Sequence, residues 1–124
     1  MSVRVLITGA ASGIGYQVGK ILASHGHLVY MTCRSVKEVF SLRKKLNKEG
    51  IDAICLKLDL LTDDIQLVDS LDIDCLFNHA GLGTAGSLLV MIEDSLRDVY
   101  EVNIFRSFLL LKKVYQHMKE KKIK

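Results

Sequence analysis

The sequence predicts an α/β fold built on a doubly wound parallel sheet, in which helices cover both faces. Two observations carry this prediction. Short apolar, β-branched runs alternate with segments of helical spacing along the 124 residues, a pattern typical of parallel strands joined by right-handed crossovers. A group of glycines also lies directly between the first such run and the first helical segment, at Gly9, Gly13 and Gly15.

The elements follow one another in strict alternation. The predicted strands are the short apolar runs, at residues 3–8, 27–33, 51–58 and 73–77. The predicted helices carry apolar residues at helical spacing, and they cover residues 13–25, 36–48, 62–70 and 94–121. Gly26 and Gly50 suit the ends of the first two helices, and Thr62 suits the cap of the third. We expect the strand order 3-2-1-4, truncated after the fourth strand and the long helix that follows, which is the first part of such a fold.

Composition indicates one globular domain over residues 1–124. Hydrophobic residues make up 49% and charged residues 25%, which excludes a disordered chain. The apolar runs are too short to span a membrane. The net charge is +3, with six lysines within residues 112–124, but no aromatic residues interleave with them in a nucleic-acid-binding pattern. Cys33, Cys55 and Cys75 lie in or beside predicted strands, which indicates core thiols in the cytoplasm and no disulfides.

The glycine group has the features of a dinucleotide-binding loop. A strand precedes it and a helix follows it, so that backbone N–H groups at the helix start can approach a pyrophosphate. The alternative is an ordinary turn, in which Thr8 and Ser12 form hydrogen bonds within the loop. The candidate cofactor-binding residues of this segment are Gly9, Ala11, Ser12, Gly13, Ile14 and Gly15.

The end of the second strand predicts a preference between the two nicotinamide dinucleotides. An acidic residue there binds the ribose 2′-hydroxyl of NAD, whereas an arginine accommodates the 2′-phosphate of NADP. The sequence has Arg34 and Ser35 at this point, and the first carboxylate is Glu38. We therefore expect NADP(H) to be preferred over NAD(H), with a solvated arginine as the alternative.

Four motifs in order resemble those of the short-chain dehydrogenase/reductase family. Residues 8–15 match its T-G-x-x-x-G-x-G loop, and Asp59-Leu60 match its aspartate after the third strand. Residues 78–81 (NHAG) resemble its N-N-A-G motif, with His79 in place of an asparagine, and Val102-Asn103 resemble the segment that holds its catalytic asparagine. The resemblance covers the N-terminal half of such enzymes. It implies a Rossmann-like fold and hydride transfer between NADP(H) and a carbonyl or alcohol. It also implies cofactor contacts at Asp59, Leu60, Asn78, Ala80 and Gly81, and a catalytic asparagine at Asn103 that binds a water of the proton relay.

Each of these motifs has a structural alternative. Asp59 can cap the following helix, and Asn78 can brace neighbouring strands. His79 can be a structural donor, and Asn103 can mark an irregular stretch of helix.

The rest of the family's catalytic set is not matched. Tyr115 and Lys119 have the Y-x-x-x-K spacing, but they follow Asn103 on the same predicted helix, whereas the family's pair lies on the next one. We expect this chain to be inactive alone, as a fragment produced by engineered truncation, proteolysis or gene disruption. The alternative is a non-catalytic dinucleotide-binding or subunit-interaction module. The histidines and cysteines have no metal-ligand spacing, so no metal site is expected.

A partner is expected from two unprotected surfaces. The fourth predicted strand has a free edge, and the long helix carries apolar residues on more than one stripe. Free edges recruit other strands, and a helix of this kind needs cover on two sides. We therefore expect a homo-oligomer formed through the long helix or the exposed edge.

Overall fold

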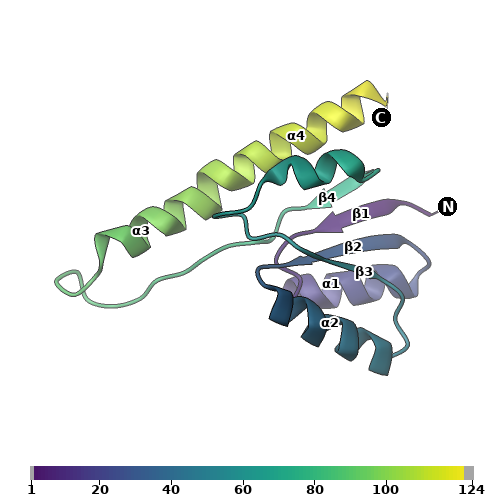
Figure 1. The fold of residues 1–124 in the computed structure, drawn as a ribbon, viewed down its shortest axis with the longest axis horizontal. Helices are drawn as coiled ribbons and strands as arrows, with labels where there is room; N and C mark the ends of the chain where they lie inside the picture. The colour runs from purple at the N-terminus through teal and green to yellow at the C-terminus, as the bar shows by residue number, and fades with distance from the viewer. Residues whose placement is uncertain (1, 122–124) are drawn as a thin grey trace.

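A computed structural model describes residues 2–121 and has a four-stranded parallel sheet with the order β3-β2-β1-β4 (Figure 1). The strands are β1 (Arg4–Ile7), β2 (Leu28–Cys33), β3 (Ile54–Lys57) and β4 (Cys75–Phe77). The α/β fold and the predicted strand order are confirmed. Strands β3 and β4 are shorter than predicted, because each is an edge strand that pairs with one neighbour over only four and three residues.

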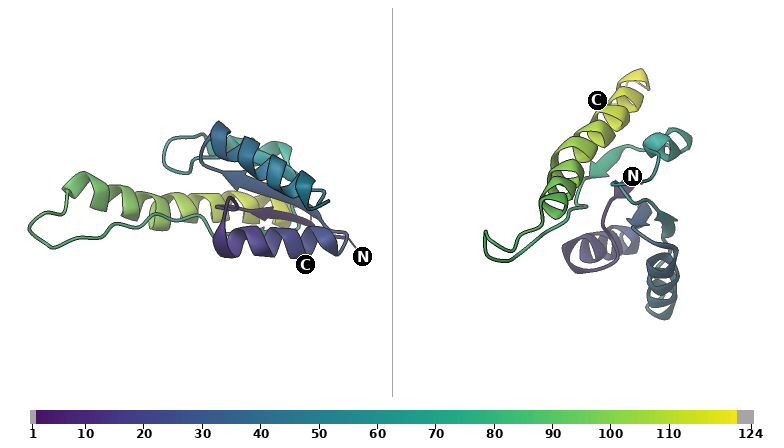
Figure 2. Two further views of the ribbon diagram at one scale, coloured as in Figure 1. Left: turned by 90° about the horizontal axis from the view of Figure 1, so that it is seen from below. Right: turned by 60° about the vertical axis from the view of Figure 1, so that its left-hand side comes forward.

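Helices cover both faces of this sheet. Helices α1 (Gly13–Ser24) and α2 (Val36–Lys48) lie on one face, and the short 3₁₀ helix η1 (Ile65–Ser70) lies with the C-terminal helix on the other (Figures 1 and 2). The C-terminal helix consists of α3 (Glu93–Tyr100), the π-helical segment η2 (Glu101–Arg106) and α4 (Ser107–Glu120). Lys122 and Lys124 of the basic stretch lie outside the described residues. Among those described, no helix has both the length and the apolar composition needed to cross a lipid bilayer.

Two helix predictions need correction. The helix predicted at residues 62–70 is a 3₁₀ helix that begins at Ile65, and its cap is Asp64 rather than Thr62. The Asp64 carboxylate accepts a hydrogen bond from the backbone N–H of Gln66 at 2.9 Å, which satisfies a donor that the helix start leaves free. The long helix predicted at residues 94–121 begins at Glu93 and contains a π-helical turn in its middle.

The core has two layers, one on each side of the sheet. Along β1, Val5 and Ile7 pack against the layer beneath α1 and α2, whereas Leu6 packs against η1 and α4. This alternation follows from the two-residue period of a strand. Some apolar residues with helical spacing are on the surface, because the apolar stripes of the helices are wider than their contacts with the sheet; the exposed ones on α1 and α2 are Ile14, Ile21, Val36 and Phe40.

The three cysteines are all free thiols, but only two are core residues. Cys33 and Cys55 are buried between the sheet and the helices. Burial raises the pKa of Cys33 to about 12 and also raises the pKa of Cys55. Cys75 is exposed on the edge strand β4, so its prediction as a core thiol was wrong.

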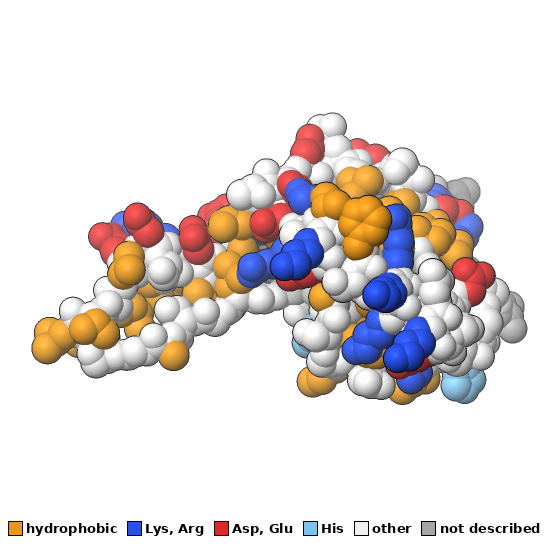
Figure 3. Space-filling model, turned by 60° about the horizontal axis from the view of Figure 1, so that its bottom comes forward, with side chains coloured by type: hydrophobic (Ala, Val, Ile, Leu, Met, Phe, Trp, Pro, Cys, Tyr) orange, Lys and Arg blue, Asp and Glu red, His pale blue; other side chains and the backbone are white. Residues whose placement is uncertain are grey.

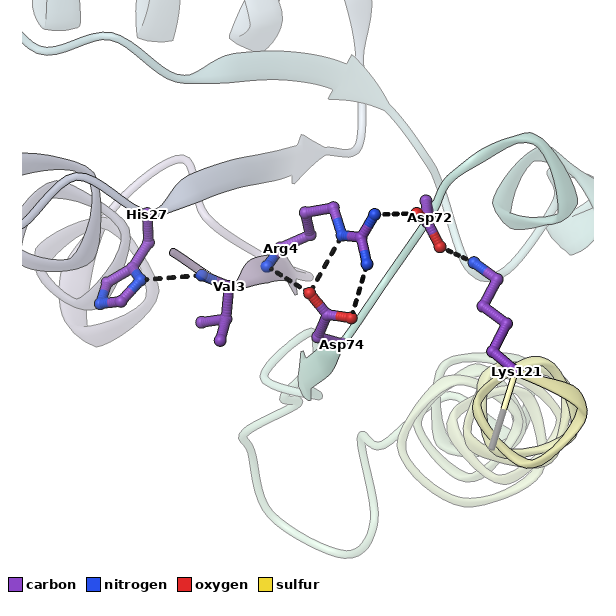
Figure 4. A network of polar contacts seen from close by, with 6 residues as sticks. All are labelled: Val3, Arg4, His27, Asp72, Asp74 and Lys121. Atoms are coloured by element: carbon purple, nitrogen blue, oxygen red, sulfur yellow. Dashed lines mark hydrogen bonds and ion pairs between the residues drawn. The ribbon is translucent and has the colours of Figure 1, made fainter. Parts of the chain in front are cut away.

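A polar network fastens the end of the sheet opposite the glycine loop (Figure 4). The Arg4 guanidinium donates to both carboxylate oxygens of Asp74, at 3.0 and 2.9 Å, and the backbone N–H of Arg4 adds a third bond at 2.9 Å. Arg4 also pairs with Asp72, which pairs in turn with Lys121 at the end of the C-terminal helix, directly after α4. Together these bonds hold β1, β4 and the C-terminal helix at one end.

Candidate functional site

Residues predicted from separate motifs meet at the carboxyl ends of the strands. A small pocket there, which we call the strand-end pocket, contains six predicted residues, and its lining is Gly9, Arg34, Leu58, Asp59, Leu60, Ala80, Gly81, Leu82 and Val102. A wider groove, which we call the α2 groove, contains three more, and its lining is Ala11, Ser12, Ser35, Lys37, Glu38, Ser41, Leu42 and Lys45. Parallel strands end at the same sheet edge, so residues far apart in sequence become neighbours there.

Each glycine of the loop meets a different physical demand. Gly9 has φ of +65°, and a Cβ at this position would lie 2.8 Å from the Cα of Ala80. A Cβ on Gly15 would lie 2.6 Å from the carbonyl oxygen of Gly9 and 2.9 Å from the ring of His79. Gly13 has φ of +63°, but a Cβ there would meet no protein atom within 4 Å. The loop is therefore packed tightly against the β4 loop and open to solvent at Gly13.

The hydroxyl of Thr8 joins the glycine loop to the loop after β4. Thr8 is fully buried, and its Oγ1 accepts hydrogen bonds from the backbone N–H groups of His79 at 3.0 Å and Ala80 at 2.9 Å. The same hydroxyl lies 3.4 Å from Oδ1 of Asn78, and Nδ2 of Asn78 donates to the carbonyl of Ser107 at 3.1 Å. Thr8 and Asn78 thus brace β1, β4 and α4, and they leave the backbone of Ala80 and Gly81 facing the strand-end pocket.

The turn after β3 is closed by its own carboxylates. Oδ1 of Asp59 accepts from the N–H of Leu61 at 3.0 Å, and Oδ2 of Asp63 accepts from the N–H of Asp59 at 2.7 Å. This bond to Asp59 and the Lys57 ammonium at 2.9 Å lower the pKa of Asp63. Asp59 therefore caps its own turn, at the position where it also lines the strand-end pocket.

Asn103 lies in η2 and is bound to the loop that follows β4. Its Oδ1 accepts from the N–H of Leu82 and its Nδ2 donates to the carbonyl of Leu82, each at 2.8 Å. A π-helical turn is often found at functional sites. Here it presents Asn103 to Leu82 while Val102 lines the strand-end pocket.

Arg34 and Ser35 stand where β2 ends and α2 begins. Arg34 is exposed and lines the strand-end pocket, and its backbone N–H donates to Oε2 of Glu38 at 3.1 Å. Ser35 caps α2 by accepting from the N–H of Glu38 at 3.2 Å. Ser12 precedes α1, and its side chain makes no capping bond, so its hydroxyl is available in the α2 groove.

Two lysines of the α2 groove were missed in the sequence. Lys37 and Lys45 add positive charge beside Ser12 and Ser35, and Lys45 also lies over the ring of Tyr16, 3.9 Å from its centroid. Their eight-residue spacing along α2 places both on one side of that helix. The signal was therefore present, but it looked like the ordinary solvated face of an amphipathic helix.

The remaining sequence candidates lie elsewhere. Tyr115 is exposed on α4, in an apolar patch with Phe108 and Leu111, and it lines neither the strand-end pocket nor the α2 groove. Ile14 is 65% exposed at the start of α1. Within residues 2–121, no group of three or more histidine, cysteine, aspartate or glutamate side chains is placed to hold a metal ion.

Comparison with protein families and curated proteins shows extended similarity. The short chain dehydrogenase model matches residues 3–123. A Streptomyces virginiae protein named as a ketoacyl reductase of the monensin polyketide synthase is 33% identical over 88% of this chain and 44% of its own length. The 5-keto-D-gluconate 5-reductase of Escherichia coli K12 is 29% identical over 96% of this chain and 50% of its own length. The chain thus spans about half the length of the curated relatives it matches.

Solved structures share this fold. The actinorhodin polyketide ketoreductase with NADPH superposes with a TM-score of 0.82 at 26% identity, over 97% of this chain and 49% of the ketoreductase. A short-chain dehydrogenase from Sphingobium yanoikuyae in complex with NADPH gives a TM-score of 0.82 at 25% identity, over 96% of this chain and 50% of that enzyme.

Proposed function

Because this chain belongs to the short chain dehydrogenase family, we propose that it is the NADP(H)-binding part of an oxidoreductase that interconverts a carbonyl and an alcohol. When bound, NADP(H) supplies or accepts the hydride. The residues described above bind the dinucleotide and hold its adenosine half at the carboxyl ends of the strands.

The observation that carries this proposal is the glycine loop beside the strand-end pocket. At Gly13 the loop is open to solvent, and the first N–H groups of α1 have no partner within their own helix. A pyrophosphate fits this position, because the helix start provides donors and a favourable dipole. Asp59, Leu60, Ala80 and Gly81 then surround the adjoining space for adenosine.

A preference for NADP(H) is supported by the charges around the end of β2. Arg34 is exposed at the rim of the strand-end pocket, and Lys37 and Lys45 line the neighbouring α2 groove. The Glu38 carboxylate lies in the same groove and opposes an anion, but it accepts the backbone N–H of Arg34. The local balance therefore favours a 2′-phosphate.

Calorimetric titration of NADP⁺ and NAD⁺ tests this preference. A charge-assisted hydrogen bond is worth about 1.5–3 kcal/mol, so Arg34→Ala should weaken NADP⁺ binding by roughly ten- to a hundredfold and change NAD⁺ binding little. Lys48→Ala is the matched control, because Lys48 is at the far end of α2, outside the α2 groove. Equal affinities of the unmodified chain for the two dinucleotides would contradict the preference.

The catalytic step needs a proton donor that these residues do not supply. Among the groups of the family's catalytic set, Asn103 is the one matched in position, and its side-chain amide is bound to Leu82. We propose that it orders the pocket wall and contributes to the proton relay. The acid that protonates the developing alkoxide would come from outside these 124 residues, so the chain alone should lack significant dehydrogenase activity.

We also propose that the chain self-associates through the C-terminal helix or the free edge of β4. Ile104, Phe105, Phe108, Leu111 and Tyr115 are each more than half exposed, and within the described part of the chain β4 has one strand neighbour, β1. The helix and the loop before it extend beyond the sheet as an arm, with apolar side chains at its tip (Figures 2 and 3). An apolar surface of this kind is typical of an interface.

Light scattering coupled to size exclusion tests the self-association. Phe108→Glu should lower the apparent mass toward 13.9 kDa, because it places a charge within the apolar face of α4. Phe40→Glu is the matched control, since Phe40 on α2 is similarly exposed, at 65% against 61%. A monodisperse monomer of the unmodified chain at micromolar concentration would refute the proposal.

The cysteines bear on the cellular location. Cys33, Cys55 and Cys75 are free thiols, and thiols persist where the environment is reducing. This supports our proposal of a cytoplasmic location.

A further inference from the structure

The π-helical segment η2 is bonded to both walls of the strand-end pocket. On one side Asn103 pairs with the backbone of Leu82. On the other side Arg106 donates from Nε to the carbonyl of Leu60 at 2.5 Å and from Nη2 to the carbonyl of Asp63. Leu60 and Leu82 both line the pocket, and Val102 of η2 lines it as well. The two walls are therefore held by side chains three residues apart on one helical segment.

Arg106 supplies the hydrogen bonds that attach the turn after β3 to the C-terminal helix. The N–H groups of Asp59, Leu61, Thr62 and Asp63 all form hydrogen bonds within the turn. These bonds close the turn on itself but do not attach it to the C-terminal helix. Arg106 makes that attachment through the carbonyls of Leu60 and Asp63.

The charge of Arg106 suits this position. It is half-buried, and its guanidinium helps to lower the pKa of the Asp63 carboxyl, which also binds Lys57. A guanidinium has several donors in a fixed plane, so it can bind two carbonyls at once. A lysine at this position would provide the charge without this paired geometry.

We propose that Arg106 is a positioning residue for the adenosine half of the dinucleotide, acting through Leu60 and Asp59. Arg106 does not itself line the strand-end pocket. It holds the turn after β3, which does line the pocket, and η2 sets the distance between this turn and Leu82. This inference rests on the proposed function, because it assumes that adenosine occupies that pocket.

The test compares three variants of the full 124-residue chain. Arg106→Gln removes the charge and the paired donors, and Arg106→Lys keeps the charge. Arg97→Gln is the control, because Arg97 is an arginine of the same long helix whose side chain is 73% exposed and pairs with Glu93 of its own helix. The calorimetric probes are NADP⁺ and adenosine 2′,5′-bisphosphate, which contains the adenosine half alone.

We expect Arg106→Gln to weaken both probes by the same factor, about tenfold, which is the low end for a lost hydrogen bond to a charged group. Arg106→Lys should restore part of this loss, and Arg97→Gln should change neither affinity. In the ligand-free chain, amide hydrogen exchange at Leu61 and Asp63 should be faster in Arg106→Gln, whereas exchange in β1 should stay unchanged.

Two results would overturn the inference. One is an Arg106→Gln variant whose probe affinities and exchange rates match those of the unmodified chain. The other is faster exchange throughout, including β1, in Arg106→Gln and Arg106→Lys alike, because this would indicate only a general loss of stability. If the unmodified chain binds neither probe, the proposed function fails; unchanged exchange at Leu61 and Asp63 would then refute the positioning role separately.

Discussion

Replacing Thr8 with valine should destabilise the chain far more than the change in shape suggests. Valine has nearly the same volume as threonine, so the core around this fully buried residue keeps its packing. The hydroxyl, however, is the acceptor for two backbone N–H groups, those of His79 and Ala80. In Thr8→Val both donors lose their partner at the point where the glycine loop meets the β4 loop.

The size of the effect follows from these two bonds. A buried donor left without a partner costs about 1–3 kcal/mol. Because His79 and Ala80 are only partly buried, water can reach them in part, and we expect a total loss of about 2–4 kcal/mol in the free energy of unfolding. Thr8→Ser keeps the acceptor and loses one methyl group, so it should cost only about 1 kcal/mol.

Urea unfolding followed by circular dichroism measures both variants. The order of stability should be wild type, then Thr8→Ser, then Thr8→Val. If Thr8→Val is as stable as wild type while Thr8→Ser is not, the methyl group rather than the hydroxyl stabilises this position, and the bracing role of Thr8 is wrong.

Two further predictions concern the thiols and the sheet end. Ellman's reagent should label one thiol quickly in the native chain, that of exposed Cys75, since Cys33 and Cys55 are buried with raised pKa values; equally fast labelling of all three would contradict the burial. The Arg4 guanidinium lowers the pKa of Asp74, so Asp74 should contribute stability above its unfolded pKa of about 4 and lose it as the pH falls through the lower folded pKa. Asp74→Asn should be less stable at neutral pH and flatten this part of the stability curve; an unchanged pH profile would exclude the contribution.

The strand order and the composition of the pocket could be predicted because both depend on strong local patterns. Short β-branched runs and glycine-ended helices determine the alternation, and the alternation determines which strand ends become neighbours. This is why Gly9, Arg34, Asp59 and Gly81, from four separate segments, meet in one pocket; that they bind a cofactor stays a prediction.

The lengths of the edge strands could not be predicted in the same way. The apolar runs at 51–58 and 73–77 are longer than the strands they contain, because a residue is in a strand only where a neighbour pairs with it. The exposure of apolar side chains on the helices could not be predicted either, because it also depends on contacts between elements. Phe40 has the spacing of a core residue, but α2 contacts the sheet through a narrower stripe that contains Val39, Leu42 and Leu46.

The role of η2 shows a more general limit of prediction from the sequence. A glycine that tolerates no Cβ leaves a trace in the sequence, because only one residue type fits. The bonds of Arg106 go to backbone carbonyls, which every residue has, so nothing at Leu60 or Asp63 marks them as its partners. The change from α to π geometry at Glu101–Arg106 likewise alters only the hydrogen-bond register within a helix that the apolar spacing predicts correctly. Side chains that hold a site through main-chain atoms are therefore recognised only in the structure, and here they connect the segment of Asn103 to the wall formed by Leu60.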